Sequence, residues 1–230
     1  MVHVAHGEEV YPKCYAARVN DKPTLRGVLH QWSAGIALGA GLVLVAMAPT
    51  VRSSLGAGVF AASLVTLLTV SATYHRVNWS PPARAWMRRA DHASIFILIA
   101  GTYTPVALLS LPEAVGSQLL LQIWGAATAG VVVSLFWAHA PKVITAALAL
   151  LVGWLLVPYF SAVRQGLGEL GFVLVLAGGV AYSLGAVAYA AKRPNPRPGV
   201  FGYHEVFHAL TVVGAALHFA AVIGLVRAAR

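Results

Sequence analysis

The sequence is short of charge: only 10% of its 230 residues are Asp, Glu, Lys or Arg, whereas 59% are hydrophobic. A soluble domain typically carries about 25% charged residues. A chain with so few charges cannot cover a folded surface with polar groups, so a soluble globular fold is excluded. The lipid bilayer is the solvent that this composition favours.

Cysteine and acidic residues are also scarce. The single cysteine, Cys14, excludes an intrachain disulfide, and seven acidic residues against sixteen basic ones give a formal charge of +9. A basic chain could bind nucleic acid, but here the basic residues lie in short gaps between apolar runs. That distribution is typical of a membrane topology signal, so we expect no nucleic-acid partner.

Apolar runs of about 20 residues, the length that crosses a bilayer as a helix, recur along the chain. They predict an all-α fold, a seven-transmembrane helix bundle. The predicted spans are Val28–Ala48, Ser54–Val77, Asp91–Leu111, Ser117–Ala138, Pro141–Ser161, Glu169–Ala191 and Gly202–Val226. Prolines mark several of the breaks between them.

The basic residues predict the orientation of this bundle. Twelve lysines and arginines fall on one side of the seven spans and four on the other, and the richer side is normally cytoplasmic. The sequence therefore predicts a cytoplasmic polar tail over residues 1–27, a membrane domain over 28–226 and a short external tail over 227–230. The first run is too long for a signal-peptide core, so we expect a multi-pass protein of the cell membrane.

Ionisable side chains gather at one depth in this topology. His204 and His208 are four residues apart, as are Ser71 and His75, and each pair therefore lies on one face of its helix. Asp91 opens the third span. All three helix ends are predicted to be cytoplasmic, so these costly groups should meet near that face.

These residue types indicate a metal site. Neutral imidazole suits zinc, and three histidines with an open fourth position are typical of hydrolytic centres, where the metal supplies hydroxide at neutral pH. The predicted ligands of Zn²⁺ are His75, His204 and His208. We expect Asp91 to move a proton or orient the water, and Ser71 to hydrogen-bond the water or stabilise an oxyanion.

A structural interpretation remains open, since a pair of histidines in an apolar helix can also serve packing or interhelical hydrogen bonding. The coincidence of His75 and Asp91 at one depth favours the metal. His30, near the cytoplasmic end of the first span, is expected at the membrane interface, and so is His139.

Three further polar residues have no assigned role. His92 and Glu205 adjoin Asp91 and His204, and neighbours on a helix point about 100° apart, so both are less suited to the metal. His218 lies ten residues beyond His208, about 15 Å along the helix. It either lines a deeper cavity or pairs with a neighbouring helix.

The motif set resembles a known family, the bacterial haemolysin III proteins of the progestin and adiponectin receptor superfamily. The likeness rests on Ser71-x-x-x-His75, on Asp91-His92 followed by Ile99-Ala-Gly-Thr-Tyr-Thr-Pro105, and on Gly202-Tyr-His204-Glu-x-Phe-His208. It covers roughly residues 20–228.

The resemblance implies seven spans, a cytoplasmic N-terminus and zinc on His75, His204 and His208, with Ser71 and Asp91 beside the metal. It also implies hydrolysis of an amide bond in a membrane lipid, as suggested by the adiponectin receptors and the similar alkaline ceramidases. Two alternatives remain: a non-enzymatic receptor or sensor with a structural zinc, and a pore-forming protein, as the haemolysin name implies. Neither the lipid class nor the oligomeric state has a signature in the sequence.

Overall fold

The computed structural model describes residues 22–137 and 141–229, and within them the fold is helical. The elements are α2 (Val28–Ala46), α3 (Val51–Arg76), α4 (Pro81–Ser110), α5 (Glu113–Phe136), α6 (Lys142–Gly153), the 3₁₀ turn η1 (Val157–Tyr159), α7 (Phe160–Ala191) and α8 (Tyr203–Ala228). No strand occurs among the described residues, which contain one isolated bridge between Arg197 and Phe201. The predicted all-α class is confirmed.

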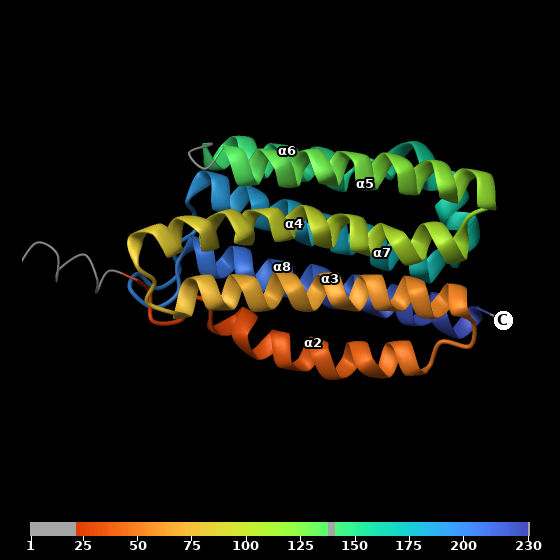
Figure 1. Ribbon diagram of the computed structural model, residues 1–230, viewed down its shortest axis with the longest axis horizontal. Helices are drawn as coiled ribbons and strands as arrows, with labels where there is room; N and C mark the ends of the chain where they lie inside the picture. The colour runs from red at the N-terminus through yellow and green to blue at the C-terminus, as the bar shows by residue number, and fades with distance from the viewer. Residues whose placement is uncertain (1–21, 138–140, 230) are drawn as a thin grey trace, which may run out of the picture.

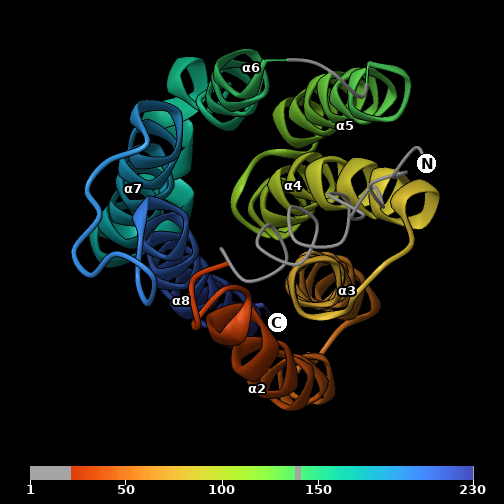
Figure 2. The same cartoon turned by 90° about the vertical axis from the view of Figure 1, so that its left-hand side faces the viewer.

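The helices lie side by side along the long axis of the molecule, and the chain reverses direction at each connection (Figure 1). Seen from the end where α2 begins, they form a ring in chain order, with α8 closing against α2 (Figure 2). Helix α4 contacts α3, α5, α6, α7 and α8, so it is the most central element.

Six helical stretches of the described chain are long and apolar enough to cross a membrane. The fifth, Val143–Ala191, has 49 residues and contains α6, η1 and α7. A straight helix of that length would measure roughly 74 Å, more than twice the ~30 Å hydrocarbon core of a bilayer. The stretch is not straight, because the chain turns back at η1 and α7 returns beside α6 (Figure 1).

The third predicted span was wrong at its start. Helix α4 begins at Pro81, ten residues before Asp91, with Pro81 and Pro82 in its first turn. Proline fits the first helical positions, where no backbone N–H is needed. The prediction followed only the apolar run, but the polar residues before it are helical too, so Asp91 lies well inside the helix.

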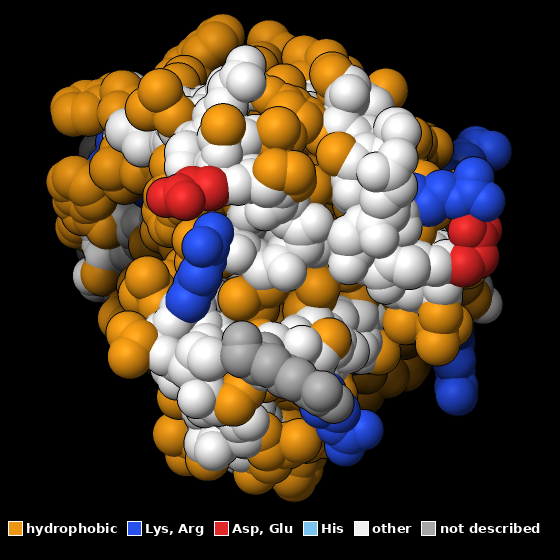
Figure 3. Space-filling view, turned by 90° about the vertical axis from the view of Figure 1, so that its right-hand side faces the viewer, with side chains coloured by type: hydrophobic (Ala, Val, Ile, Leu, Met, Phe, Trp, Pro, Cys, Tyr) orange, Lys and Arg blue, Asp and Glu red, His pale blue; other side chains and the backbone are white. Residues whose placement is uncertain are grey.

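The outer surface suits a lipid environment. Large apolar side chains point outward along the bundle, among them Trp32, Ile36, Leu121 and Leu170, each more than 70% exposed. The end opposite the start of α2 is also mostly apolar, with only scattered charged side chains (Figure 3). Hydrophobic groups therefore cover much of the exterior as well as the core.

The break between α6 and η1 is tied to its neighbours. The hydroxyl of Tyr103 donates to the carbonyl oxygen of Gly153 (2.6 Å) and accepts the N–H of Leu156 (2.9 Å). The indole N–H of Trp154 donates to Ser183 on α7 (3.0 Å). One phenol on α4 thus satisfies two of the backbone groups at the helix break.

We expect Tyr103→Phe to lower the free energy of unfolding by about 1–3 kcal/mol, because it leaves the buried N–H of Leu156 without its acceptor. The measurement is thermal unfolding in detergent. Tyr159→Phe is the matched control, since the Tyr159 hydroxyl bonds Gln122 in an exposed position. Equal effects of the two substitutions would contradict the role given to Tyr103.

Candidate metal centre

Three helix segments bring the predicted site residues to one end of the bundle. Ser71 and His75 lie in the last turns of α3, Asp91 in the third turn of α4, and His204 and His208 in the first two turns of α8. These segments meet at the end where α2 begins (Figure 1). The structure therefore brings together all five residues that the sequence singled out.

The three histidines form a compact buried group. Each of His75, His204 and His208 offers one ring nitrogen, and these atoms all lie within 4.8 Å of one another. The Nε2 atoms of His75 and His204 are 3.2 Å apart. None of the three residues is more than 8% exposed. A buried group of this kind could bind a metal ion.

The acidic group approaches the histidines from α4. One carboxylate oxygen of Asp91 lies 4.0 Å from Nε2 of His75, and the side chain is 15% exposed. Ser71, which is 3% exposed, lies close enough to this carboxylate to act on it. At 4.0 Å the carboxylate is near the cluster without a direct hydrogen bond to His75.

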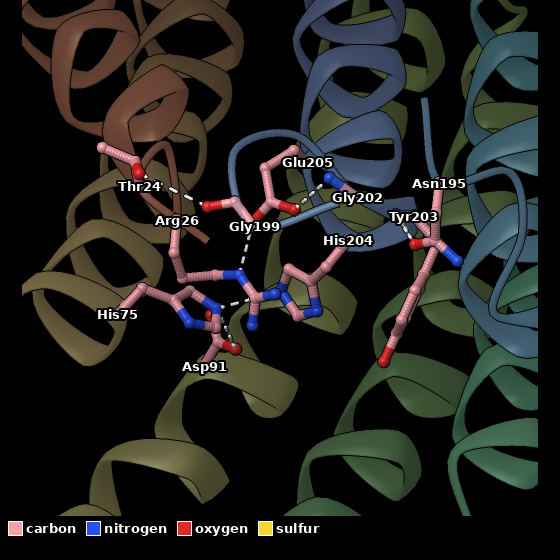
Figure 4. A network of polar contacts seen from close by, with 10 residues as sticks. All are labelled: Thr24, Arg26, His75, Asp91, Asn195, Gly199, Gly202, Tyr203, His204 and Glu205. Carbon is pink, nitrogen blue, oxygen red and sulfur yellow. Dashed lines mark hydrogen bonds and ion pairs between the residues drawn. The ribbon is translucent and has the colours of Figure 1, made fainter. Parts of the chain in front are cut away.

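A buried ion pair fixes the start of α8. Nε of Arg26 donates to Oε1 of Glu205 at 2.5 Å, and the other oxygen, Oε2, accepts the backbone N–H of Gly202 at 2.8 Å (Figure 4). Glu205 is 1% exposed. The carboxylate thus caps the N-terminus of α8 and ties it to the segment before α2.

Backbone contacts reinforce this junction. The N–H groups of Thr24 and Leu25 donate to the carbonyls of Gly199 and Val200, at 3.0 and 3.2 Å. Gly27, two residues after Leu25, has a φ of +78°. A Cβ at this position would meet Cβ of His75 at 2.7 Å. Glycine is the residue that allows both this conformation and this close approach.

Sequence reasoning missed the pairing of Arg26 with Glu205. The two residues are 179 positions apart, and Glu205 had no assigned role because it points away from His204. A weak signal was present: an acidic residue three positions after Gly202 fits the pattern of a helix N-terminus.

His30 was also misjudged. The sequence placed it at the membrane interface, but it is 2% exposed and its ring stacks on that of His208, with centroids 3.8 Å apart and planes 7° apart. Both of its ring nitrogens lack a hydrogen-bond partner among the described residues, as does Nδ1 of His208. A fourth histidine therefore packs directly against the cluster, on α2.

A cavity of about 150 Å³ extends from the cluster into the bundle. Ser71, Asp91 and His204 line one end, and apolar residues such as Leu98, Ala149 and Leu150 line much of the rest. Such a cavity, apolar with a few polar groups at one end, suits an amphipathic molecule.

His218 and His92 also line this cavity. Nε2 of His218 donates to the carbonyl oxygen of Val175 on α7, at 3.0 Å. His218 thus both faces the cavity and pairs with a neighbouring helix, the two roles that the sequence left open. The predicted membrane-interface residue His139 and most of the predicted N-terminal tail lie outside the described residues.

These features define a multi-pass membrane protein with a buried trihistidine group that could bind a metal ion. The family described as "Haemolysin-III related" matches residues 19–219. The chain belongs to this haemolysin III family, within the progestin and adiponectin receptor superfamily.

Relatives from bacteria and a plant agree with this assignment. The chain is 28% identical to the "Hemolysin-3 homolog" of Bacillus subtilis (strain 168), over 72% of this chain and 74% of that protein. It is 29% identical to "Hemolysin-3" of Bacillus cereus, over 72% of each. It is 32% identical to the "Heptahelical transmembrane protein ADIPOR2" of Oryza sativa subsp. japonica, over 71% of this chain and 79% of that protein.

If the cluster binds a metal, His208→Ala should remove it while His218→Ala retains it. His208 belongs to the trihistidine group, whereas His218 is ten residues further along α8 and bonded to Val175. The measurement is metal content per chain of the purified, folded variants by elemental analysis. Equal metal content in the two variants would exclude His208 as a ligand.

Proposed function

We propose that this protein is a zinc-dependent hydrolase that cleaves an amide or ester bond of a membrane lipid near the cytoplasmic face. The observation that carries the proposal is the opening of an apolar cavity onto a buried trihistidine group with a carboxylate and a hydroxyl beside it. A lipid could place its chain in the cavity and its carbonyl group at the histidines.

The donor set fits zinc. A tetrahedral zinc with Zn–N distances of about 2.0–2.1 Å holds two ligand nitrogens roughly 3.3 Å apart. The Nε2 atoms of His75 and His204 are separated by 3.2 Å, whereas the three nitrogens together spread over up to 4.8 Å and would draw closer on binding. Together with His208, these two residues would supply three neutral nitrogen ligands. When bound in such a site, zinc polarises a carbonyl group and makes water nucleophilic at neutral pH.

The chain's own residues would manage the proton and the developing charge. In hydrolysis, the oxygen of water bonds to the carbonyl carbon, the bond from that carbon to nitrogen or oxygen breaks, and a proton passes to the leaving group. Asp91, 4.0 Å from His75, would take the proton from the water and deliver it. Ser71, which lies beside Asp91, can hold that carboxylate in position or donate to the carbonyl oxygen.

The topology proposed with this function has seven spans, with α6 and α7 crossing separately. The turn at η1 supports this count, and the name of the rice relative describes that protein as heptahelical. The basic end of the bundle would then face the cytoplasm, with residues 1–27 inside, residues 227–230 outside and the cell membrane as the location.

A lytic function is the second candidate, favoured by the name "Hemolysin-3" of the Bacillus cereus relative. In that case, or in a receptor or sensor, the zinc would be structural. Structural zinc sites normally have four protein ligands, and Asp91 would be the fourth. The hydrolase proposal instead requires the fourth position to be open to water and substrate.

Asp91→Asn tests the enzyme directly. We expect it to lower lipid amide or ester hydrolysis by at least about a hundredfold, since general acid–base groups contribute typically 10²–10⁴-fold, while the metal content stays the same. The control is Glu169→Gln, because Glu169 is an exposed carboxylate far from the cavity. Unchanged turnover in Asp91→Asn would rule out the proton-transfer role. Loss of the metal in this variant would favour a structural zinc with Asp91 as its fourth ligand.

A further inference from the structure

Positive charge gathers over the same end of the bundle as the histidines. Lys22 and Arg26 come from the segment before α2, and Arg84 and Arg88 from the first turns of α4. The charges of Lys22, Arg26 and Arg84 all lie close enough to act on His75. Those of Arg26, Arg84 and Arg88 act on its neighbour Tyr74.

The cations are also close to each other. The pKa of Lys22 is lowered, first by partial burial and then by the like charges of Arg84 and Arg26. The guanidinium of Arg84 lies over the ring of Tyr74 on α3, 5.2 Å from its centroid. Two segments about 60 residues apart in sequence thus bring their positive charges together, at a cost in mutual repulsion.

Acidic residues do not balance this cluster. Of the four carboxylates in the described chain, Glu113 begins α5 and Glu169 follows the start of α7 by nine residues, and both helices begin at the opposite end of the bundle (Figure 1). Glu205 is engaged by Arg26, and Asp91 faces His75 and Ser71. Neither Lys22 nor Arg84 has an ion pair with a carboxylate among the described residues. Within that part of the chain, these two cations therefore have positive charge available for an anion from outside.

Membrane topology alone does not account for this arrangement. The positive-inside rule requires basic residues on one side of the membrane, at any position in the loops. Here the charges of Lys22, Arg26 and Arg84 all lie close to His75, whose neighbours Asp91 and His204 line one end of the cavity. Figure 4 shows the guanidinium of Arg26 beside the rings of His75 and His204. An anion held by the cluster would be next to the trihistidine group.

We infer that the lipid bound at this centre carries an anionic headgroup, a phosphate or a carboxylate, which Lys22 and Arg84 bind while Arg88 adds to the local field. The inference rests on the proposed hydrolase function and narrows its substrate class. The headgroup would lie at the basic end, the scissile carbonyl at the histidines and the acyl chain in the apolar cavity. An uncharged lipid of the same chain length would lack the headgroup contacts.

The experiment compares two lipid amides with the same acyl chain, one with a phosphate headgroup and one with a hydroxyl, in uncharged detergent micelles. We expect the KM of the zinc-loaded protein for the phosphate lipid to be at least about tenfold lower, since one charge-assisted contact is typically worth that factor or more. Lys22→Gln combined with Arg84→Gln should remove most of this preference, and added salt should weaken it. Arg197→Gln, an exposed cation in the α7–α8 connection, is the matched control and should leave the preference intact.

Binding is measured separately, so that failure of the inference and failure of the enzyme are distinguishable. A single-chain alkyl phosphate, which has no carboxamide or carboxylic ester bond, should raise the melting temperature of the protein but not of the Lys22/Arg84 double variant. Equal KM values for the two amides, or equal stabilisation of the double variant, would overturn the inference and leave the hydrolase standing. Stabilisation by the lipid with no cleavage of either amide would support the anion site and overturn the enzyme. If inorganic phosphate stabilises the protein as well as the lipid does, the site binds free phosphate and the lipid assignment is overturned.

Discussion

The structure depends on how a bilayer-embedded bundle accommodates ionisable groups. A charged or strongly polar side chain inside a membrane protein is costly unless it finds a partner or lines a cavity. Here His75, Asp91, His204 and Glu205 lie within their helices at one end of the bundle, and each has a partner from another segment. Their mutual contacts offset the cost that any of them would carry alone.

The need of buried ionisable groups for partners also explains the role of the segment before α2, which supplies one. Arg26 neutralises Glu205, and Glu205 caps α8 through the N–H of Gly202. The first turns of α8 carry His204 and His208, so the ion pair sets the position of two of the three histidines. His30, in the first turn of α2, stacks on His208 from the same side. The entry to the first helix is therefore part of the support of the centre.

The chemistry that we propose uses the same cluster of polar groups. The histidines, the carboxylate and the hydroxyl meet at one end of an apolar cavity, with the charges of Lys22, Arg26 and Arg84 close to His75. A soluble hydrolase would have to extract a lipid from the membrane, whereas the proposed enzyme would receive the lipid within it. In the proposed complex, the headgroup would meet the basic residues, the scissile carbonyl would meet the histidines, and the acyl chain would meet the apolar cavity.

Much of this arrangement could be predicted from the sequence because the signals are local or periodic. Apolar runs located the membrane-capable helices, and the four-residue spacing of His204 and His208 placed both on one face. The beginning of α4 was missed because polar residues can extend a helix beyond its apolar run. The Arg26–Glu205 pair and the burial of His30 are contacts between distant segments, and no local pattern encodes which polar group a distant helix will meet.

X-ray absorption spectroscopy at the zinc edge, on the purified protein in detergent, tests the central claim most directly. The account predicts one zinc per chain with three imidazole nitrogens at about 2.0–2.1 Å and one further oxygen ligand. A well-folded preparation that binds no zinc, or a zinc without imidazole ligands, would contradict it. The histidines would then be a packing and hydrogen-bonding cluster.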